Sequence, residues 1–146
     1  MSTRCMIKFI SPFKKIGKMT TREVVLYHHH DGYPTGVGLG LMDFIKTLRE
    51  EKEKYPKSTP DCDGELRKLI ESDSDYEITF WNHSDIEYYY TVDLSKLKVY
   101  IETAEWEDNK KVTKNKMDMD KLIKISMKTG NKNLDEIYWE KFHKEE

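Results

Sequence analysis

The sequence predicts an α+β fold in which an antiparallel sheet of about five strands packs with three to four helices, in the order ββααβββαα. Three observations lead to this prediction. Several short stretches alternate between apolar and polar residues with a period of two, as half-buried strands do. Other stretches repeat apolar residues every three or four positions, as amphipathic helices do. Turn-forming residues separate these stretches.

The first half of the chain is predicted to form a β-hairpin followed by two helices. The two strands are rich in apolar, β-branched and aromatic residues, and a basic loop at 13–21 joins them. Apolar residues at helical spacing then predict a long helix, which Tyr55-Pro56 ends, and a shorter one. These elements are strands at 5–10 and 23–30 and helices at 37–54 and 65–71.

The second half is predicted to add three strands and further helices. The strands alternate strictly and are linked by short connections, which is typical of an antiparallel meander. They are residues 76–81, 86–92 and 97–102. Residues 108–116 are polar and predicted to form a loop, after which Asp118 or Asp120 could cap a helix that Gly130 ends. We expect one domain over 1–146, with 108–146 a helical C-terminal extension packed on it.

Composition narrows the class of protein. The chain is 37% hydrophobic and 36% charged, and its 12% aromatic residues allow a thin core rich in rings. Cys5 and Cys62 are expected to be reduced thiols, since no secretory signal precedes them. No stretch approaches the roughly 18 apolar residues of a membrane span. The sequence therefore predicts a cytoplasmic protein without a membrane partner.

Charge is unevenly distributed along the chain. Residues 61–108 contain fourteen Asp and Glu against four Lys and Arg. Such an acidic block argues against direct nucleic-acid binding, which needs clustered cations. It is either a set of solvated strand faces and turns or a surface that fits a cationic site on a partner protein.

Three consecutive histidines end the second predicted strand. In an extended strand His28 and His30 point to one face and His29 to the other. His28 and His30 could share a metal with Asp31, but the sequence places no further ligand beside them, so we expect neither a metal nor another cofactor. General acid–base catalysis by a histidine with Asp31 is the enzymatic alternative. Because no nucleophile lies nearby in the sequence, a binding protein is favoured over an enzyme.

Four glycines follow the histidines, at Gly32, Gly36, Gly38 and Gly40. A glycine-rich turn between a strand and a helix can present backbone N–H groups to a phosphate. The spacing matches no dinucleotide or P-loop pattern. Close packing of the helix against the sheet explains the glycines equally well.

A run of tyrosines, residues 88–90, occupies one of the later strands. Alternation predicts that Tyr89 lies on the opposite face from its neighbours, together with Tyr100 and Trp81. An exposed aromatic face of this kind suits a protein partner or stacking on a base. Ordinary cross-strand pairing of rings is the alternative.

Two segments resemble a family of small phage and prophage proteins. These are Met1-Ser2-Thr3-Arg4 and the turn His28-His29-His30-Asp31-Gly32-Tyr33-Pro34, which fits the H-x-D-G-Y-P pattern of that family. The resemblance covers residues 1–48 and, more loosely, 76–101, where Glu87–Asp93 is similar to a tyrosine-bearing strand. It implies a viral origin and a location in the host cytoplasm, and it brings no established chemistry.

We therefore expect a phage- or prophage-type accessory protein that acts by binding. Its ligand would be a small phosphate-bearing, nucleotide-like molecule or a host protein in counter-defence, and a homo-oligomer is compatible with the sequence. A histidine-centred, metal-assisted hydrolase or nuclease is the alternative. The expected ligand-binding residues are His28, His30, Asp31, Tyr33, Gly36, Gly38 and Tyr89.

Overall fold

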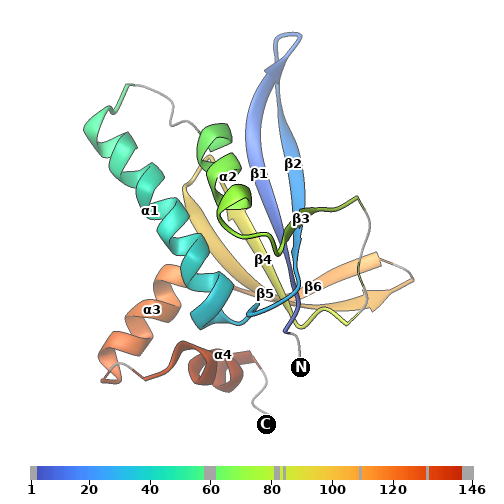
Figure 1. Cartoon of the computed structure of the whole chain (residues 1–146), viewed down its shortest axis with the longest axis vertical. Coiled ribbons are helices and arrows are strands. Elements are labelled where there is room, and N and C mark those ends of the chain that lie inside the picture. Colours follow the sequence, from blue (N-terminus) through green and yellow to red (C-terminus); the bar gives the residue numbers. More distant parts are fainter. Residues whose placement is uncertain are drawn as a thin grey trace.

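The computed structural model describes residues 3–57, 62–80, 83, 85–108, 110–130 and 132–142. It has the predicted α+β class, with a six-stranded sheet and four helices that lie on one side of it (Figure 1). In chain order the elements are β1 (Cys5–Lys15), β2 (Lys18–His28), a π-helical turn (Pro34–Gly38), α1 (Leu39–Lys54), α2 (Cys62–Ser72), β3 (Tyr76–Ile78), β4 (Tyr88–Asp93), β5 (Lys98–Glu107), β6 (Lys110–Asp118), α3 (Met119–Lys128) and α4 (Leu134–Phe142).

The sheet is mixed and not antiparallel throughout as predicted, with the strand order β3-β2-β1-β4-β5-β6. β1 and β2 form a hairpin, β4 to β6 run antiparallel, and β1 and β4 are parallel neighbours in the centre. The predicted meander of three consecutive strands is wrong, because β3 pairs with β2 on the far side of the hairpin from β4. The connection at 79–87 is long enough to cross the roughly 15 Å between them.

Two segments predicted as loops belong to strands. The basic loop at 13–21 is the end of a long hairpin, which turns at Ile16 and Gly17 with φ of 47° and 75°. Positive φ at both positions is what a two-residue type I′ turn requires. Residues 110–118 form β6 and pair with β5. The sheet thus has six strands instead of five, and the helical part of the C-terminal region begins only at Met119.

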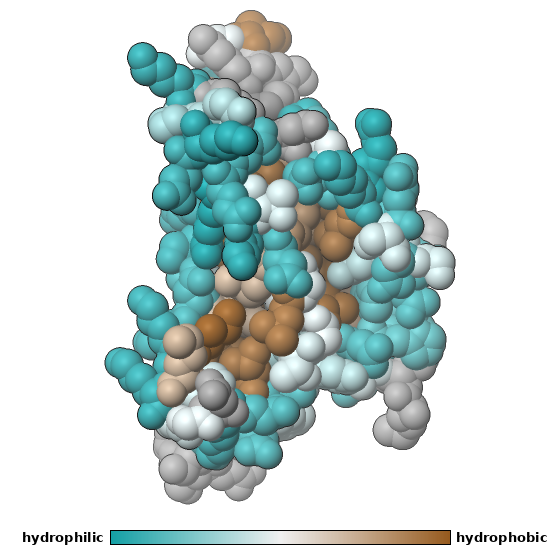
Figure 2. Space-filling model, turned by 60° about the vertical axis from the view of Figure 1, so that its left-hand side comes forward, coloured by the Kyte–Doolittle hydropathy of each residue, from teal (hydrophilic) through white to brown (hydrophobic). Residues whose placement is uncertain are grey.

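The core lies between the sheet and the helices. Helical spacing predicted the inward face of the first helix correctly, since Leu41, Phe44, Ile45 and Leu48 are all buried there. The buried strand residues on this side are Cys5, Ile7, Phe9, Leu26, Tyr88, Tyr90, Val92, Val99 and Ile101. Seen from the helical side, the surface is largely hydrophilic, with hydrophobic residues visible between the charged ones (Figure 2).

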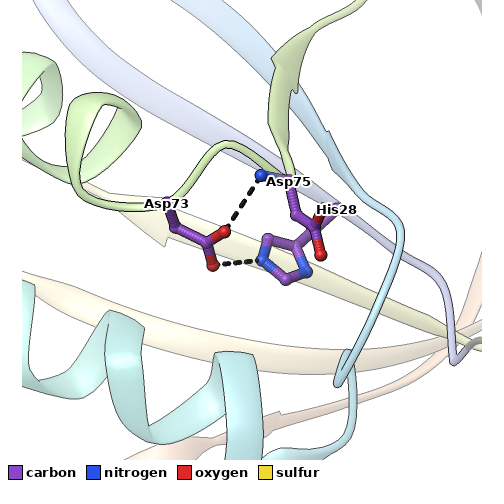
Figure 3. A group of neighbouring side chains, drawn as sticks. All are labelled: His28, Asp73 and Asp75. Atoms are coloured by element: carbon purple, nitrogen blue, oxygen red, sulfur yellow. Dashed lines mark hydrogen bonds and ion pairs between the residues drawn. The ribbon is translucent and has the colours of Figure 1, made fainter.

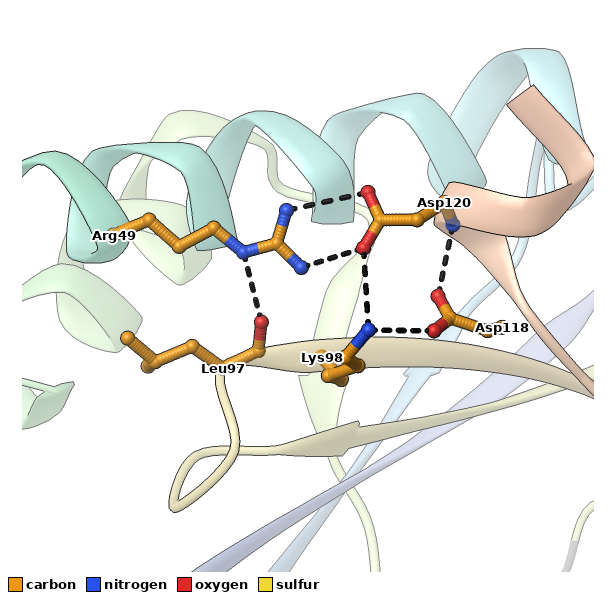
Figure 4. A network of polar contacts seen from close by, with 5 residues as sticks. All are labelled: Arg49, Leu97, Lys98, Asp118 and Asp120. Carbon is orange, nitrogen blue, oxygen red and sulfur yellow. Dashed lines mark hydrogen bonds and ion pairs between the residues drawn. The ribbon is translucent and has the colours of Figure 1, made fainter. Parts of the chain in front are cut away.

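A network of polar contacts joins α1 and α3 to the N-terminal end of β5 (Figure 4). Arg49 donates two hydrogen bonds to the carboxylate of Asp120, at 3.2 and 2.7 Å, and a third to the carbonyl of Leu97 at 2.9 Å. The guanidinium holds the pKa of Asp120 below its usual range. Lys98 donates to Asp118 at 2.8 Å, and Asp118 caps α3 by accepting the backbone N–H of Asp120. Of the two predicted caps, Asp118 is therefore the one used.

Tyr90 connects the central strand to the start of the helical layer. Its side chain is 1% exposed, and its hydroxyl donates to the carbonyl of Gly32 at 2.7 Å. We expect Tyr90→Phe to lower the free energy of unfolding by about 1–2 kcal/mol, because the buried carbonyl loses its donor. Urea unfolding followed by circular dichroism measures this change. An unchanged unfolding midpoint would show that the hydrogen bond adds no net stability.

Candidate functional site

The turn after β2 is closed by its own polar groups. Asp31 has a φ of 55°, a conformation that aspartate tolerates better than most residues, and accepts the hydroxyl of Tyr33 at 2.8 Å. The N–H of Gly36 donates to the carbonyl of Tyr33, and that of Val37 to the carbonyl of Asp31. A Cβ at Gly36 would lie 2.2 Å from the Asp31 carbonyl oxygen, so the turn requires glycine there.

A carboxylate of the protein itself occupies the helix start at which the sequence predicts a phosphate. Thr35 donates its N–H and its hydroxyl to Asp135 of α4, at 3.0 and 2.7 Å. Gly38 packs against the ring of Tyr90, and its N–H reaches the carbonyl of Tyr33. These N–H groups are therefore already hydrogen-bonded. Gly32, Gly36 and Gly38 therefore serve close packing, which is the alternative that the sequence left open, whereas a Cβ at Gly40 would meet only the hydroxyl of Tyr76 at 4.0 Å.

The predicted histidines pair with aspartates from the loop between α2 and β3. His28 Nε2 lies 2.7 Å from Oδ2 of Asp73, and His30 Nδ1 lies 2.7 Å from Oδ2 of Asp75. A carboxylate only accepts, so each of these nitrogens carries the proton. The hydrogen bonds that Asp73 accepts from His28 and from the backbone of Asp75 hold its pKa below its usual range.

His28 is the buried member of this group. It is 3% exposed, and its ring packs edge-on against Tyr76 with centroids 4.4 Å apart. Its Nδ1 has no hydrogen-bond partner among the described residues, which costs about 1–3 kcal/mol for a buried polar atom. One ligating atom each from His28, Asp73 and Asp75 lies within 4.8 Å of the other two (Figure 3).

A second, smaller hydrophobic cluster lies on the other face of the sheet. Among the described residues, none of its members belongs to a helix. It consists of Met6, Tyr27 and Tyr89, with Val25 packed against it. Alternation predicted the face of Tyr89 correctly, but the ring is only 7% exposed and is not open for stacking. Tyr100 is half-buried on the same face, and Trp81 lies outside the described residues. We call this surface the uncovered face.

A charged group lies buried on the uncovered face. Glu102 is 4% exposed and accepts hydrogen bonds from the hydroxyls of Thr91 and Thr113. Burial opposes its ionisation, but these hydrogen bonds and the charges of Lys111 and Lys116 outweigh that effect and lower the pKa of Glu102. The network holds a carboxylate in the ionised form on β5, the strand next to the edge strand β6.

Lys111 lies over this carboxylate and over an aromatic ring. Its Nζ is 3.7 Å from Oε2 of Glu102 and 4.7 Å from the centre of the Tyr89 ring. Burial lowers the pKa of Lys111, and the charges of Lys8 and Lys116 lower it further, while Glu102 opposes the change. Three lysines therefore influence one another around a single carboxylate, which leaves the region with excess positive charge.

Two hollows adjoin, and Met6 and Val25 of the uncovered face line both. The first has a volume of about 200 Å³ and is also lined by Lys8, Tyr89, Tyr90 and Lys111. The second has a volume of about 340 Å³ and is also lined by Glu23, Val24, Ile78, Thr79 and Phe80. The first hollow is thus cationic and the second mainly apolar.

The chain was compared with protein-family models, curated proteins and solved structures. No protein-family model, curated protein or solved structure matches the chain. Within the described ranges, no helix is long and apolar enough to cross a bilayer.

The structure thus separates the predicted site residues into three places. Asp31, Tyr33, Gly36 and Gly38 build the turn, His28 and His30 face the two aspartates, and Tyr89 lies on the uncovered face. Sequence reasoning missed the aspartates, because they lie 45 residues from their histidines. It also missed Lys8 and Lys111, because they come from strands far apart in the sequence and the polar strand β6 leaves no alternating pattern.

Proposed function

We propose that the protein binds a small phosphate-bearing, nucleotide-like ligand on the uncovered face of its sheet. The adjoining hollows support this proposal best, because one offers cations and the other an apolar surface. A nucleotide has a matching division, with charge at the phosphate and an apolar, planar base. The ligand class expected from the sequence is kept, and its place moves from the turn to the face that contains Tyr89.

The cationic hollow suits a phosphate group. Lys111 has three N–H donors, and Glu102 lies near only one side of it, so donors remain for an anion. The two threonine hydroxyls engage the Glu102 carboxylate, which reduces its competition for the lysine. A lysine that is partly removed from water forms strong charge-assisted hydrogen bonds with a phosphate oxygen. Lys8 lines the same hollow and would add a second contact.

The apolar hollow suits a base. Phe80 is 90% exposed, and Ile78 beside it is also exposed, although both are large hydrophobic residues. Both line the second hollow together with Met6 and Val25. Stacking of a base on an aromatic ring contributes about 1–3 kcal/mol and tolerates any base. We place the base against Phe80 and the phosphate at the lysines.

Titration calorimetry with a panel of ribonucleoside mono- and triphosphates tests the proposal. The expected result is saturable binding that weakens with salt and is at least tenfold weaker in Lys8→Gln and in Lys111→Gln, since each removes one charge-assisted contact. Lys110→Gln is the matched control. Lys110 precedes Lys111 on β6, is exposed, and is not among the residues that line either hollow. It should leave the affinity unchanged.

A second variant separates the two ends of the ligand. Phe80→Ala should weaken binding of nucleotides and leave binding of inorganic pyrophosphate unchanged, because pyrophosphate has no base to stack. If no nucleotide binds, or if the Lys8→Gln/Lys111→Gln double variant binds as tightly as the original chain, the proposal is wrong.

The biological setting we propose follows from the sequence resemblance alone. Because the N-terminal residues and the turn at 28–34 resemble those of phage and prophage proteins, we propose that the ligand is a host-cell molecule and that its binding counteracts a host defence. A host protein that contacts the acidic segment 61–108 is the alternative partner. Pull-down of a host protein that depends on acidic residues of this segment, without any nucleotide binding, would favour that alternative.

A further inference from the structure

We propose that His28, Asp73 and Asp75 bind a divalent transition-metal ion. This site is separate from the two hollows, because His28 points to the helical side of the sheet and none of the three residues lines either hollow. The sequence offered His28 and His30 with Asp31 and no further ligand, and the structure places Asp31 outside the group. The loop between α2 and β3 supplies the carboxylates.

The three side chains are close enough to share one ion. One ligating atom of each lies within 4.8 Å of the other two. In a bound site with metal–ligand distances near 2.1 Å, ligating atoms are about 3–4 Å apart. Asp73 and Asp75 are partly exposed, with 43% and 35% of their side chains accessible, so small rotations of these two carboxylates close the difference.

The imidazole of His28 provides a separate indication of an ion. It is 3% exposed, and its Nδ1 has no hydrogen-bond partner among the described residues. Figure 3 shows the ring between the two carboxylates, with the unbonded nitrogen on the side of Asp75 in that view. A buried nitrogen without a partner calls for an explanation, and a bound ion is one. A cation can take the free lone pair of Nδ1 or replace the Nε2 proton beside Asp73.

The groups around the three ligands hold them in position. The backbone N–H of Asp75 donates to Oδ1 of Asp73 at 2.9 Å, which fixes one carboxylate to the other's main chain. His30 donates to Asp75, and Tyr76 packs on the ring of His28. Hydrogen bonds of this kind orient the ligands in known metal sites. His30 is therefore a positioning residue.

The donor set indicates which cation fits. One imidazole with two carboxylates suits Zn²⁺, Mn²⁺ or Fe²⁺ better than Mg²⁺ or Ca²⁺, which prefer oxygen ligands alone. Three protein ligands leave at least one coordination position for water. The exposed edges of Asp73 and Asp75 place that position toward solvent.

Metal titration of the full chain tests the site, with Co²⁺ and Zn²⁺ as probes. We expect one equivalent of Co²⁺ with a visible absorption band. We also expect Zn²⁺ at 100 times its Kd to raise the melting temperature by about 5–10 °C. Asp73→Asn and Asp75→Asn should each weaken binding at least tenfold. Both substitutions keep the size of the side chain, and both residues are partly exposed, so the variants should fold.

Asp43→Asn is the control, because Asp43 is an exposed aspartate of α1 outside this group. It should bind metal like the unchanged chain. Substitution of buried His28 can disturb folding, and for that reason the carboxylates carry the test. The proposal is overturned if the chain binds neither cation saturably at millimolar concentration. It is equally overturned if the Asp73→Asn/Asp75→Asn double variant binds with unchanged affinity.

Discussion

Gly36→Ala is expected to lower the free energy of unfolding by about 3 kcal/mol or more, at the upper end of the cost of overpacking. The added methyl carbon would lie 2.2 Å from the carbonyl oxygen of Asp31. No side-chain rotation relieves this contact, because both groups are fixed to the main chain. Separation of the two segments would also weaken the hydrogen bond from Val37 to Asp31, now 2.8 Å long. Chemical unfolding followed by far-ultraviolet circular dichroism measures the loss.

Gly40→Ala provides the matched control four residues further on. A Cβ at Gly40 would meet only the hydroxyl of Tyr76, at 4.0 Å, and the residue lies inside α1. Because alanine favours a helix over glycine by up to about 1 kcal/mol, this variant should be unchanged or slightly more stable. Similar destabilisation by both substitutions would contradict the role assigned to the turn.

The periodic parts of the fold could be predicted from the sequence. Apolar residues at helical spacing identified the inward face of α1, including Leu41 and Leu48. Strict alternation placed Tyr90 and Tyr89 on opposite faces of β4. In both cases one side of the element packs against the core, so burial leaves a regular pattern in the sequence.

Strand β6 left no such pattern. Its residues are mostly polar, and polar contacts across to β5 take the place of an apolar face. Lys114 lies 3.7 Å from Glu105 and also pairs with Glu107, while the hydroxyl of Thr113 donates to Glu102 at 2.8 Å. Opposite charges on neighbouring strands stabilise a sheet at its edge, but hydrophobic periodicity does not detect them. The pairing of β3 with β2 was missed for a different reason. Strands that follow one another in the sequence are usually, but not always, neighbours in the sheet, and β3 and β4 are not.

The chemistry of the candidate sites was harder to predict than the fold. The sequence identified the segment from His28 to Asp31 as unusual, but the aspartates beside its histidines come from 45 residues away. Long-range polar partners are set by how the chain folds back, and no local spacing encodes them. The same holds for the uncovered face, where lysines from β1 and β6 line one hollow with Tyr89.

Glu102→Ala is the second substitution with a large expected effect, a loss of about 2–4 kcal/mol in the free energy of unfolding. It removes the acceptor of two threonine hydroxyls and the counter-charge of partly buried Lys111. Groups left unpaired in this way are costly, whereas an exposed carboxylate contributes little. Glu105→Ala is the control on the same strand, since Glu105 is exposed and should change stability by less than about 0.5 kcal/mol.

The pH dependence of stability distinguishes the contribution of the Glu102 charge from that of its hydrogen bonds. The folded protein lowers the pKa of this carboxyl below its ordinary value of 4.5, so the folded state favours the ionised form. Its contribution is therefore fully present above the ordinary pKa and is lost as the pH falls through the lower folded pKa. Glu102→Gln keeps an acceptor for the threonines but does not titrate. We expect the stability of this variant to fall less steeply than that of the unchanged chain below about pH 5, and parallel profiles would show that the charge does not matter.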